Sequence, residues 1–185
     1  MFFIMPSLFG VGFQVPDLVV PATVRGGSKV LGQLVAFDLA NSDAATTDNA
    51  MDGGDNSGFG NVIATRSNAI EEATGIFGVI EGPGEGSQAS AGNTVADDRL
   101  AAVRMYGVTR ALVLRASGSY AKHDPLYSDQ SVAPTAMTIA PATVGEVHKQ
   151  LATCLAVVTT PTTATLASVW FFGGLPFGIA SNVGT

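Results

Sequence analysis

Few side chains of this sequence have the chemistry and spacing of a catalytic centre. Two histidines are present: His123 is followed directly by Asp124, and His148 lies two residues after Glu146. A histidine next to an acidic residue in a polar stretch is more typical of a solvated surface pair than of a catalytic pair. The chain also has no Gly-x-Ser-x-Gly elbow and no His-Glu-x-x-His pair, which would support catalysis. We therefore expect no catalytic residue, no cofactor and no enzymatic activity.

The single cysteine does not change this expectation. Cys154 lies in an apolar stretch that favours a strand, so a buried, unreactive thiol is predicted rather than a nucleophile. One cysteine also excludes a disulfide framework within the chain and a cysteine-rich zinc site.

An acidic stretch offers the best set of metal ligands in the sequence. Asp48, Asp52 and Asp55 lie within eight residues, and Ca²⁺ binds such carboxylate oxygens. The order of an EF-hand loop is not kept, because an alanine occupies one ligand position and no glutamate follows at the twelfth. A solvated loop is therefore predicted, with calcium binding as the alternative, and no metal ligand is assigned. The glycine-rich stretch 82–86 has no lysine, which favours a flexible loop over a phosphate-binding loop.

Composition and charge exclude several classes of protein. The 185 residues carry 9 Lys and Arg against 15 Asp and Glu, a net charge of −6 that disfavours nucleic-acid binding through a basic face. Hydrophobic residues make up 46% and charged residues 13%, about half of the usual ~25%. So little charge suggests that other protein covers much of the surface. We therefore predict a homo-oligomer, with a trimer as the first expectation.

Short apolar stretches separated by Gly and Pro predict a mainly β protein, a small barrel or sandwich with long polar loops. A strand over 101–115 with a kink or bulge at Gly107 is favoured over a helix at 97–107, because apolar and polar residues alternate there. Residues 67–72 are compatible with one helical turn. The other expected strands are 14–24, 30–39, 62–65, 74–81, 136–140, 151–158 and 163–172, the last two as a hairpin.

One β domain is expected over 17–174, with polar loop insertions at 40–60 and 117–135 and a C-terminal tail at 175–185. Residues 1–16 precede it as an extended arm, too short in its apolar run for a bilayer, which needs about 20 residues. We expect no membrane contact. The arm is predicted to bind a partner through its large apolar side chains, Phe2, Phe3, Ile4, Leu8, Phe9 and Phe13. The alternative is that it forms the first strand of the chain's own barrel.

The order of apolar segments resembles a known family. Its elements are 30–36 (VLGQLVA), 75–80 (GIFGVI), a strand from Val103 to Leu114 with a central glycine, and a closing strand that ends in Val169-Trp170-Phe171-Phe172. This order is similar to the small β-barrel head decoration, or cement, proteins of tailed bacteriophages. The resemblance covers about residues 20–115 and continues over 145–172, while the long loops and the Phe-rich arm depart from the shorter members.

The resemblance implies a structural virion protein on the outer capsid surface. It implies a homotrimer that stabilises the capsid by clamping neighbouring major capsid subunits. A tail or baseplate component is an alternative within the same class. A secreted β-sandwich that binds carbohydrate is the alternative from another class, supported by Tyr120, Tyr127 and the acidic loop.

Overall fold

The computed structural model describes residues 17–38, 62–65, 75–84, 93–114, 118–128, 135–138, 147–159, 163–173 and 180–182. Within these residues the regular structure consists of β-strands, with no helix, which confirms the prediction of a mainly β protein. The strands are β1 (Leu18–Val24), β2 (Lys29–Val30), β3 (Leu34–Phe37), β4 (Val62–Ala64), β5 (Phe77–Pro83), β6 (Thr94–Val95), β7 (Leu100–Val113), β8 (Pro125–Ser128), β9 (Met137–Thr138), β10 (Val147–Cys154), β11 (Thr165–Phe171) and β12 (Ala180–Asn182).

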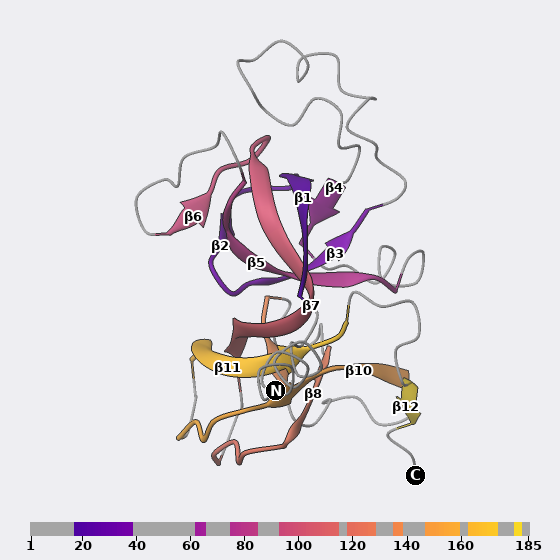
Figure 1. Cartoon of the computed structure of the whole chain (residues 1–185), viewed down its shortest axis with the longest axis vertical. Helices are drawn as coiled ribbons and strands as arrows, with labels where there is room; N and C mark the ends of the chain where they lie inside the picture. The colour runs from indigo at the N-terminus through magenta and orange to yellow at the C-terminus, as the bar shows by residue number, and fades with distance from the viewer. Residues whose placement is uncertain are drawn as a thin grey trace, which may run out of the picture.

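Five of these strands close into a small barrel, the upper part of Figure 1. β1 pairs with β4 in parallel, and the antiparallel pairs β4–β3, β3–β5, β5–β7 and β7–β1 complete the ring. A closed ring leaves few unpaired sheet edges. β2 and β6 form a separate two-stranded sheet beside it. Apolar side chains from all of the barrel strands and from β6 form the first core: Ala22, Val24, Val35, Phe37, Ile63, Ile80, Val95, Ala101 and Val103.

The long strand β7 belongs to two rings. Its residues 100–106 pair with β1, and residues 101–104 also pair with β5, whereas residues 107–113 pair with β11. From β11 the pairing continues through β10, β8 and β9 and returns to β7, where Met137 is the partner of Val113. Figure 1 shows this second ring below the barrel, with β7 running from one to the other.

β3 and β5 form a wall between two cores, and for that reason β3 is buried along its whole length. Alternate side chains of each strand point to opposite sides, as a strand requires. Val35, Phe37 and Ile80 face the first core. On the other side of the wall, Leu34 and Ala36 of β3 and Phe77 and Val79 of β5 face the second core. The remaining residues of this core come from the second ring and its loops: Ala111, Val113, Tyr120, Leu126, Met137, Leu151, Ala152, Cys154, Ala167, Val169 and Phe171.

The prediction of one continuous strand over 30–39 is wrong. The chain forms β2, turns, and resumes as β3, because Gly32 adopts the left-handed conformation with φ +80°. The Gly32 amide donates to Ile80 O at 2.8 Å, and its carbonyl accepts from Leu112 N at 2.8 Å. The turn thereby joins the barrel to the second half of β7.

The other strand predictions hold with shifted ends. β7 confirms the strand over 101–115 and excludes the helix at 97–107; its register with β1 shifts between Leu18 and Val19, and Gly107 has φ +116°. β10 and β11 form the expected antiparallel pair.

Two segments predicted to lack strands contain them. The expected loop at 117–135 includes β8, which is paired with β10 and β9, and the expected tail at 175–185 includes β12, paired with β10. Gly82 and Pro83, at the start of the expected glycine-rich loop, belong to β5. These strands are too short to show alternation in the sequence. The predicted loop at 40–60 and the helical turn at 67–72 lie outside the described residues.

The turn at Gly32 gives a test of the fold. A Cβ there would collide with the Leu166 side chain and lie 3.2 Å from Arg110 O, whereas a Cβ at Gly26, with φ +70°, meets nothing within 4 Å. We expect Gly26→Ala to cost about 1–2 kcal/mol, from the left-handed backbone alone, and Gly32→Ala to cost about 1–3 kcal/mol more. Urea unfolding measures the difference. Equal losses in the two variants would contradict the packing of this turn against β11.

Candidate functional site

The best-connected charged side chains lie where the two rings meet. Arg104, in the first half of β7, donates from Nε to Glu81 Oε1 at 2.6 Å and from Nη2 to Glu81 Oε2 at 2.8 Å. Thr109, in the second half of β7, donates its hydroxyl to the same Oε1 at 2.5 Å. Asp17 forms an ion pair with Arg104 Nη1 at 2.7 Å. We call these four residues the junction network.

Gly107 makes room for the junction network. A Cβ at this position would collide with Asp17 Oδ1 and lie 3.0 Å from Arg104 Nη1, and the φ of +116° also favours glycine. The Glu81 carboxylate binds Arg104 on one side of Gly107 and Thr109 on the other. The network therefore fixes β7 at the point where it changes from one ring to the other.

The electrostatics of the junction network favour a permanent ion pair. Burial raises the pKa of Glu81, but the hydrogen bonds from Arg104 and Thr109 lower it more, so the pKa lies below its ordinary value of 4.5. The hydrogen bond with Glu81 raises the pKa of Arg104. Neither group has a proton to exchange near neutral pH, which makes the network suited to positioning strands and unsuited to acid–base chemistry.

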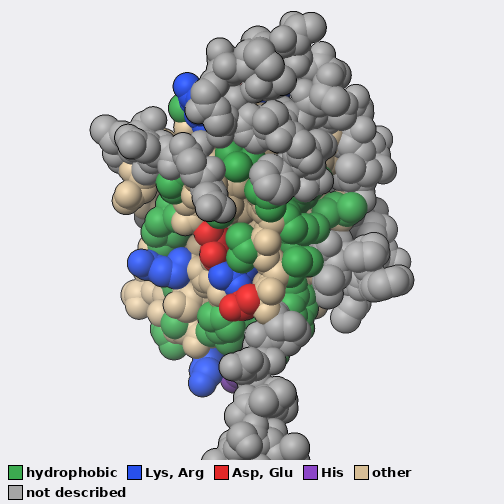
Figure 2. Space-filling view, turned by 45° about the horizontal axis from the view of Figure 1, so that its top comes forward, with side chains coloured by type: hydrophobic (Ala, Val, Ile, Leu, Met, Phe, Trp, Pro, Cys, Tyr) green, Lys and Arg blue, Asp and Glu red, His purple; other side chains and the backbone are tan. Residues whose placement is uncertain are grey.

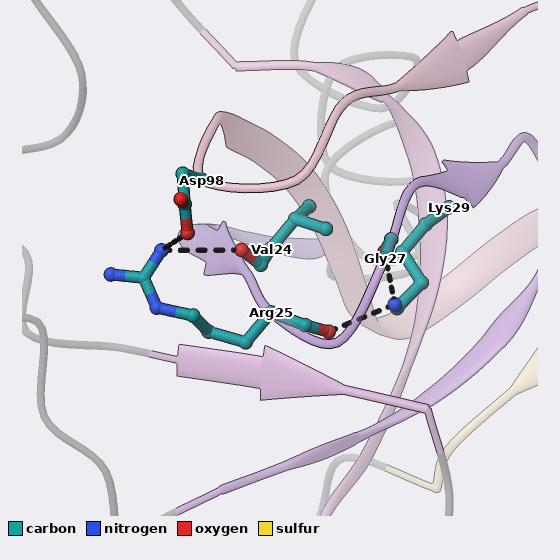
Figure 3. A network of polar contacts seen from close by, with 5 residues as sticks. All are labelled: Val24, Arg25, Gly27, Lys29 and Asp98. Atoms are coloured by element: carbon teal, nitrogen blue, oxygen red, sulfur yellow. Dashed lines mark hydrogen bonds and ion pairs between the residues drawn. The ribbon is translucent and has the colours of Figure 1, made fainter.

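A second polar network holds the turn that follows β1 (Figure 3). Lys29 is fully buried, and its ammonium donates to the carbonyl oxygens of Arg25 at 2.9 Å, Gly26 at 3.1 Å and Gly27. The Arg25 side chain points the other way and pairs with Asp98, in the turn before β7. The network thus ties together two turns at one end of the barrel.

The buried amine of Lys29 is a structural group. Burial lowers its pKa, and the charge of Asp97 acts in the opposite direction. Its ammonium donates to three backbone carbonyl oxygens of the tight turn and so holds the turn together. An amine enclosed in this way is not accessible to a substrate.

The sequence-predicted residues that the structure describes serve the fold. His123 is exposed in a turn with φ +74°, and Asp124 Oδ2 accepts a hydrogen bond from Ala121 N at 2.7 Å, so this carboxylate supports the turn. Cys154 is buried, as predicted, and burial raises the pKa of its thiol.

Other predicted residues are not brought together. His148 lies on β10, but its side chain is outside the described part of the chain. Within the described residues, no group of three or more His, Cys, Asp or Glu side chains could hold a metal ion. Outside the described residues lie Glu146, the acidic residues Asp48, Asp52 and Asp55, and the predicted partner-binding residues Phe2, Phe3, Ile4, Leu8, Phe9 and Phe13.

One surface feature was not predicted from the sequence. Val108 of β7 and Trp170 of β11 are cross-strand partners, exposed to 46% and 37%, and Leu18 at the start of β1 is exposed to 42%. Leu18 pairs with Tyr106, two residues before Val108. We call Leu18, Val108 and Trp170 the apolar strip. The position of Trp170 in its strand does indicate its exposure. Successive side chains of a strand point to opposite sides, and Val169 and Phe171 on either side of Trp170 are buried.

Charged and apolar side chains share the molecular surface. Figure 2 shows acidic and basic side chains next to one another in the middle of one face, bordered by hydrophobic side chains.

Comparison with known proteins identifies no relative: no protein-family model and no curated protein sequence matches the chain. In the described part of the chain, no helix is long and apolar enough to span a membrane.

The lowered pKa of Glu81 predicts a pH dependence of stability. A carboxyl group whose pKa is lower in the folded state stabilises the fold above its unfolded pKa, and this contribution is lost as the pH falls through the folded value. We expect Glu81→Gln to unfold more easily than the wild type at pH 7, and the difference to shrink steadily below about pH 4. Urea titrations between pH 3 and pH 7 measure it. A difference independent of pH would show that the charge of Glu81 does not stabilise the fold.

The Lys29 network predicts a second stability effect. Lys29→Met keeps the apolar part of the side chain and removes the charged donor of three hydrogen bonds to the turn, which costs about 1.5–3 kcal/mol. The matched variant Lys122→Met, at an exposed position, is expected to stay within about 0.5 kcal/mol of the wild type. Thermal and urea unfolding compare the two. Equal stabilities would mean that the turn does not depend on the ammonium.

Proposed function

We propose that this protein is a structural virion protein, without enzymatic activity, that decorates the outer surface of a tailed-phage capsid. In this role it stabilises the shell as a homotrimer that bridges major capsid subunits. The observation that carries the proposal is the apolar strip, an exposed surface in a chain whose charged networks hold its own turns and strands.

The chemistry of the strip suits a protein contact. Tryptophan is enriched at the centres of protein interfaces, where it excludes water from a large area. Val108 beside it on the neighbouring strand extends the apolar surface without a charge. The resemblance of the strand pattern to head decoration proteins supports the capsid as the place where the resulting oligomer acts.

A carbohydrate-binding module is the second candidate, because an exposed tryptophan on a sheet also presents a flat apolar ring. The aromatic residues on which this alternative was based support it less. Tyr120 is fully buried and donates its hydroxyl to Leu114 O at 2.6 Å, so it is a core residue. Tyr127 is half-buried on β8.

Co-sedimentation with empty heads tests the proposal. The full-length protein is mixed with DNA-free heads of the phage that encodes it and pelleted through a sucrose cushion. We expect saturable binding to the heads and none to purified tails. Protein that stays in the supernatant, pellets only with tails, or binds immobilised glycans as a monomer would refute the decoration role.

A histidine variant provides the matched control for this experiment. His123 is exposed in the turn before β8, outside the strands that carry the apolar strip and the junction network. His123→Ala is therefore expected to bind heads within about fivefold of the wild type, as for a surface change away from special features.

A further inference from the structure

We infer that the apolar strip binds residues 1–13 of a second copy of this chain, so that the copies exchange their N-terminal segments. This inference deepens the proposed function by naming one partner of the strip.

The strip has the properties of an acceptor surface. Trp170 and Val108 lie on adjacent strands, and Leu18 is held near them by its pairing with Tyr106. All three keep 37–46% of their surface exposed. The strands that carry them are fixed by the second ring and by the junction network, so the surface is rigid before anything binds to it. A preformed surface reduces the entropy lost on binding.

The N-terminal segment leaves the fold beside the strip and matches it chemically. Asp17 is anchored by its ion pair with Arg104, and Leu18 is the first residue of β1. The preceding 16 residues contain no charged side chain, and their Phe, Leu, Ile and Val residues are concentrated in 1–13. An uncharged, aromatic segment gains free energy only where an apolar surface receives it, because ordering its backbone costs about 1–2 kcal/mol per residue.

The sequence next to Asp17 favours a second copy over the same copy. Only residues 14–16 separate Phe13 from the anchored Asp17, so Phe13 could reach its own strip only if the chain reversed its direction within three residues. The strip of a second copy requires no such reversal. Each copy also carries both a segment and a strip. Exchange between copies therefore satisfies every segment and every strip in a closed, symmetric oligomer.

Disulfide trapping tests which copy is bound. Two full-length chains of different tag length are coexpressed, one with Phe13→Cys and the other with Val108→Cys, and the complex is oxidised. The native Cys154 is buried and does not compete. We expect a covalent heterodimer on non-reducing gels, and none when Val157→Cys, at a position exposed to 69% outside the strip, replaces Val108→Cys. A double variant that forms only the disulfide within one chain would overturn the inference, as would the absence of any cross-link.

The oligomeric state gives an independent readout. Analytical ultracentrifugation of the full chain without capsids is expected to show an oligomer that Trp170→Thr weakens at least tenfold, while Val157→Thr leaves it unchanged. Threonine favours strands, and circular dichroism checks that each variant folds. Should Trp170→Thr not fold, Val108→Thr takes its place. A monomeric wild type, or an oligomer unaffected by either strip variant, would refute the exchange.

Neither experiment contains capsids, so the two proposals fail separately. If the wild type binds heads but the Phe13→Cys and Val108→Cys pair does not cross-link, segment exchange is refuted and capsid decoration stands. Cross-linked oligomers that do not bind phage heads would refute capsid decoration and leave segment exchange standing.

Discussion

The shared strand β7 is the constraint on which the rest of this structure depends. Its first half closes the barrel against β1 and β5, and its second half starts the ring that runs through β11. A strand can serve two rings only if it changes direction without losing its hydrogen bonds. Gly107 provides the change of backbone conformation, and the Glu81 carboxylate holds the two halves in place through Arg104 and Thr109. The ion pair with Asp17 adds the start of β1 to the same point.

A wall of two strands follows from this arrangement. Because the second ring is stacked on the outer face of β3 and β5, both faces of these strands are buried, and each contributes to two cores. The charged groups are confined to the margins: the junction network lies at the contact of the rings, and Lys29 lies in a turn at one end of the barrel. Among the described residues, apolar side chains from both faces of this wall therefore pack into the two cores.

The sequence predicted the class of fold and most of the strands, because the alternation of apolar and polar residues, and the Gly and Pro residues between strands, are local signals. A change of backbone conformation at Gly107 was predictable for the same reason, because a glycine interrupts an otherwise regular alternation; the register shift of β7 against β1 falls at Met105 instead. The break at Gly32 was not, since the left-handed turn there packs against Leu166 of β11 and bonds to Leu112 of β7, and these contacts are non-local. β8 and the burial of Tyr120 were missed because a few residues carry no period, and their pairing with β10 and Val158 is non-local. The junction network was also beyond prediction, because Glu81 and Arg104 are separated by 23 residues in the chain.

The use of charge inside the fold bears on how any partner is bound. Of the 9 Lys and Arg residues, Arg25, Lys29 and Arg104 are already engaged with carbonyl or carboxylate oxygens of the same chain. Charge complementarity is therefore a weak source of affinity for this protein, and a partner gains mainly from covering apolar surface. Such a contact depends on the rigidity of the surface that offers it, because a mobile face would lose in entropy what it gains by burial. The network that lets one strand serve two rings also fixes the strands beneath the apolar strip, so the contact proposed for the strip depends on the same interactions that determine the fold.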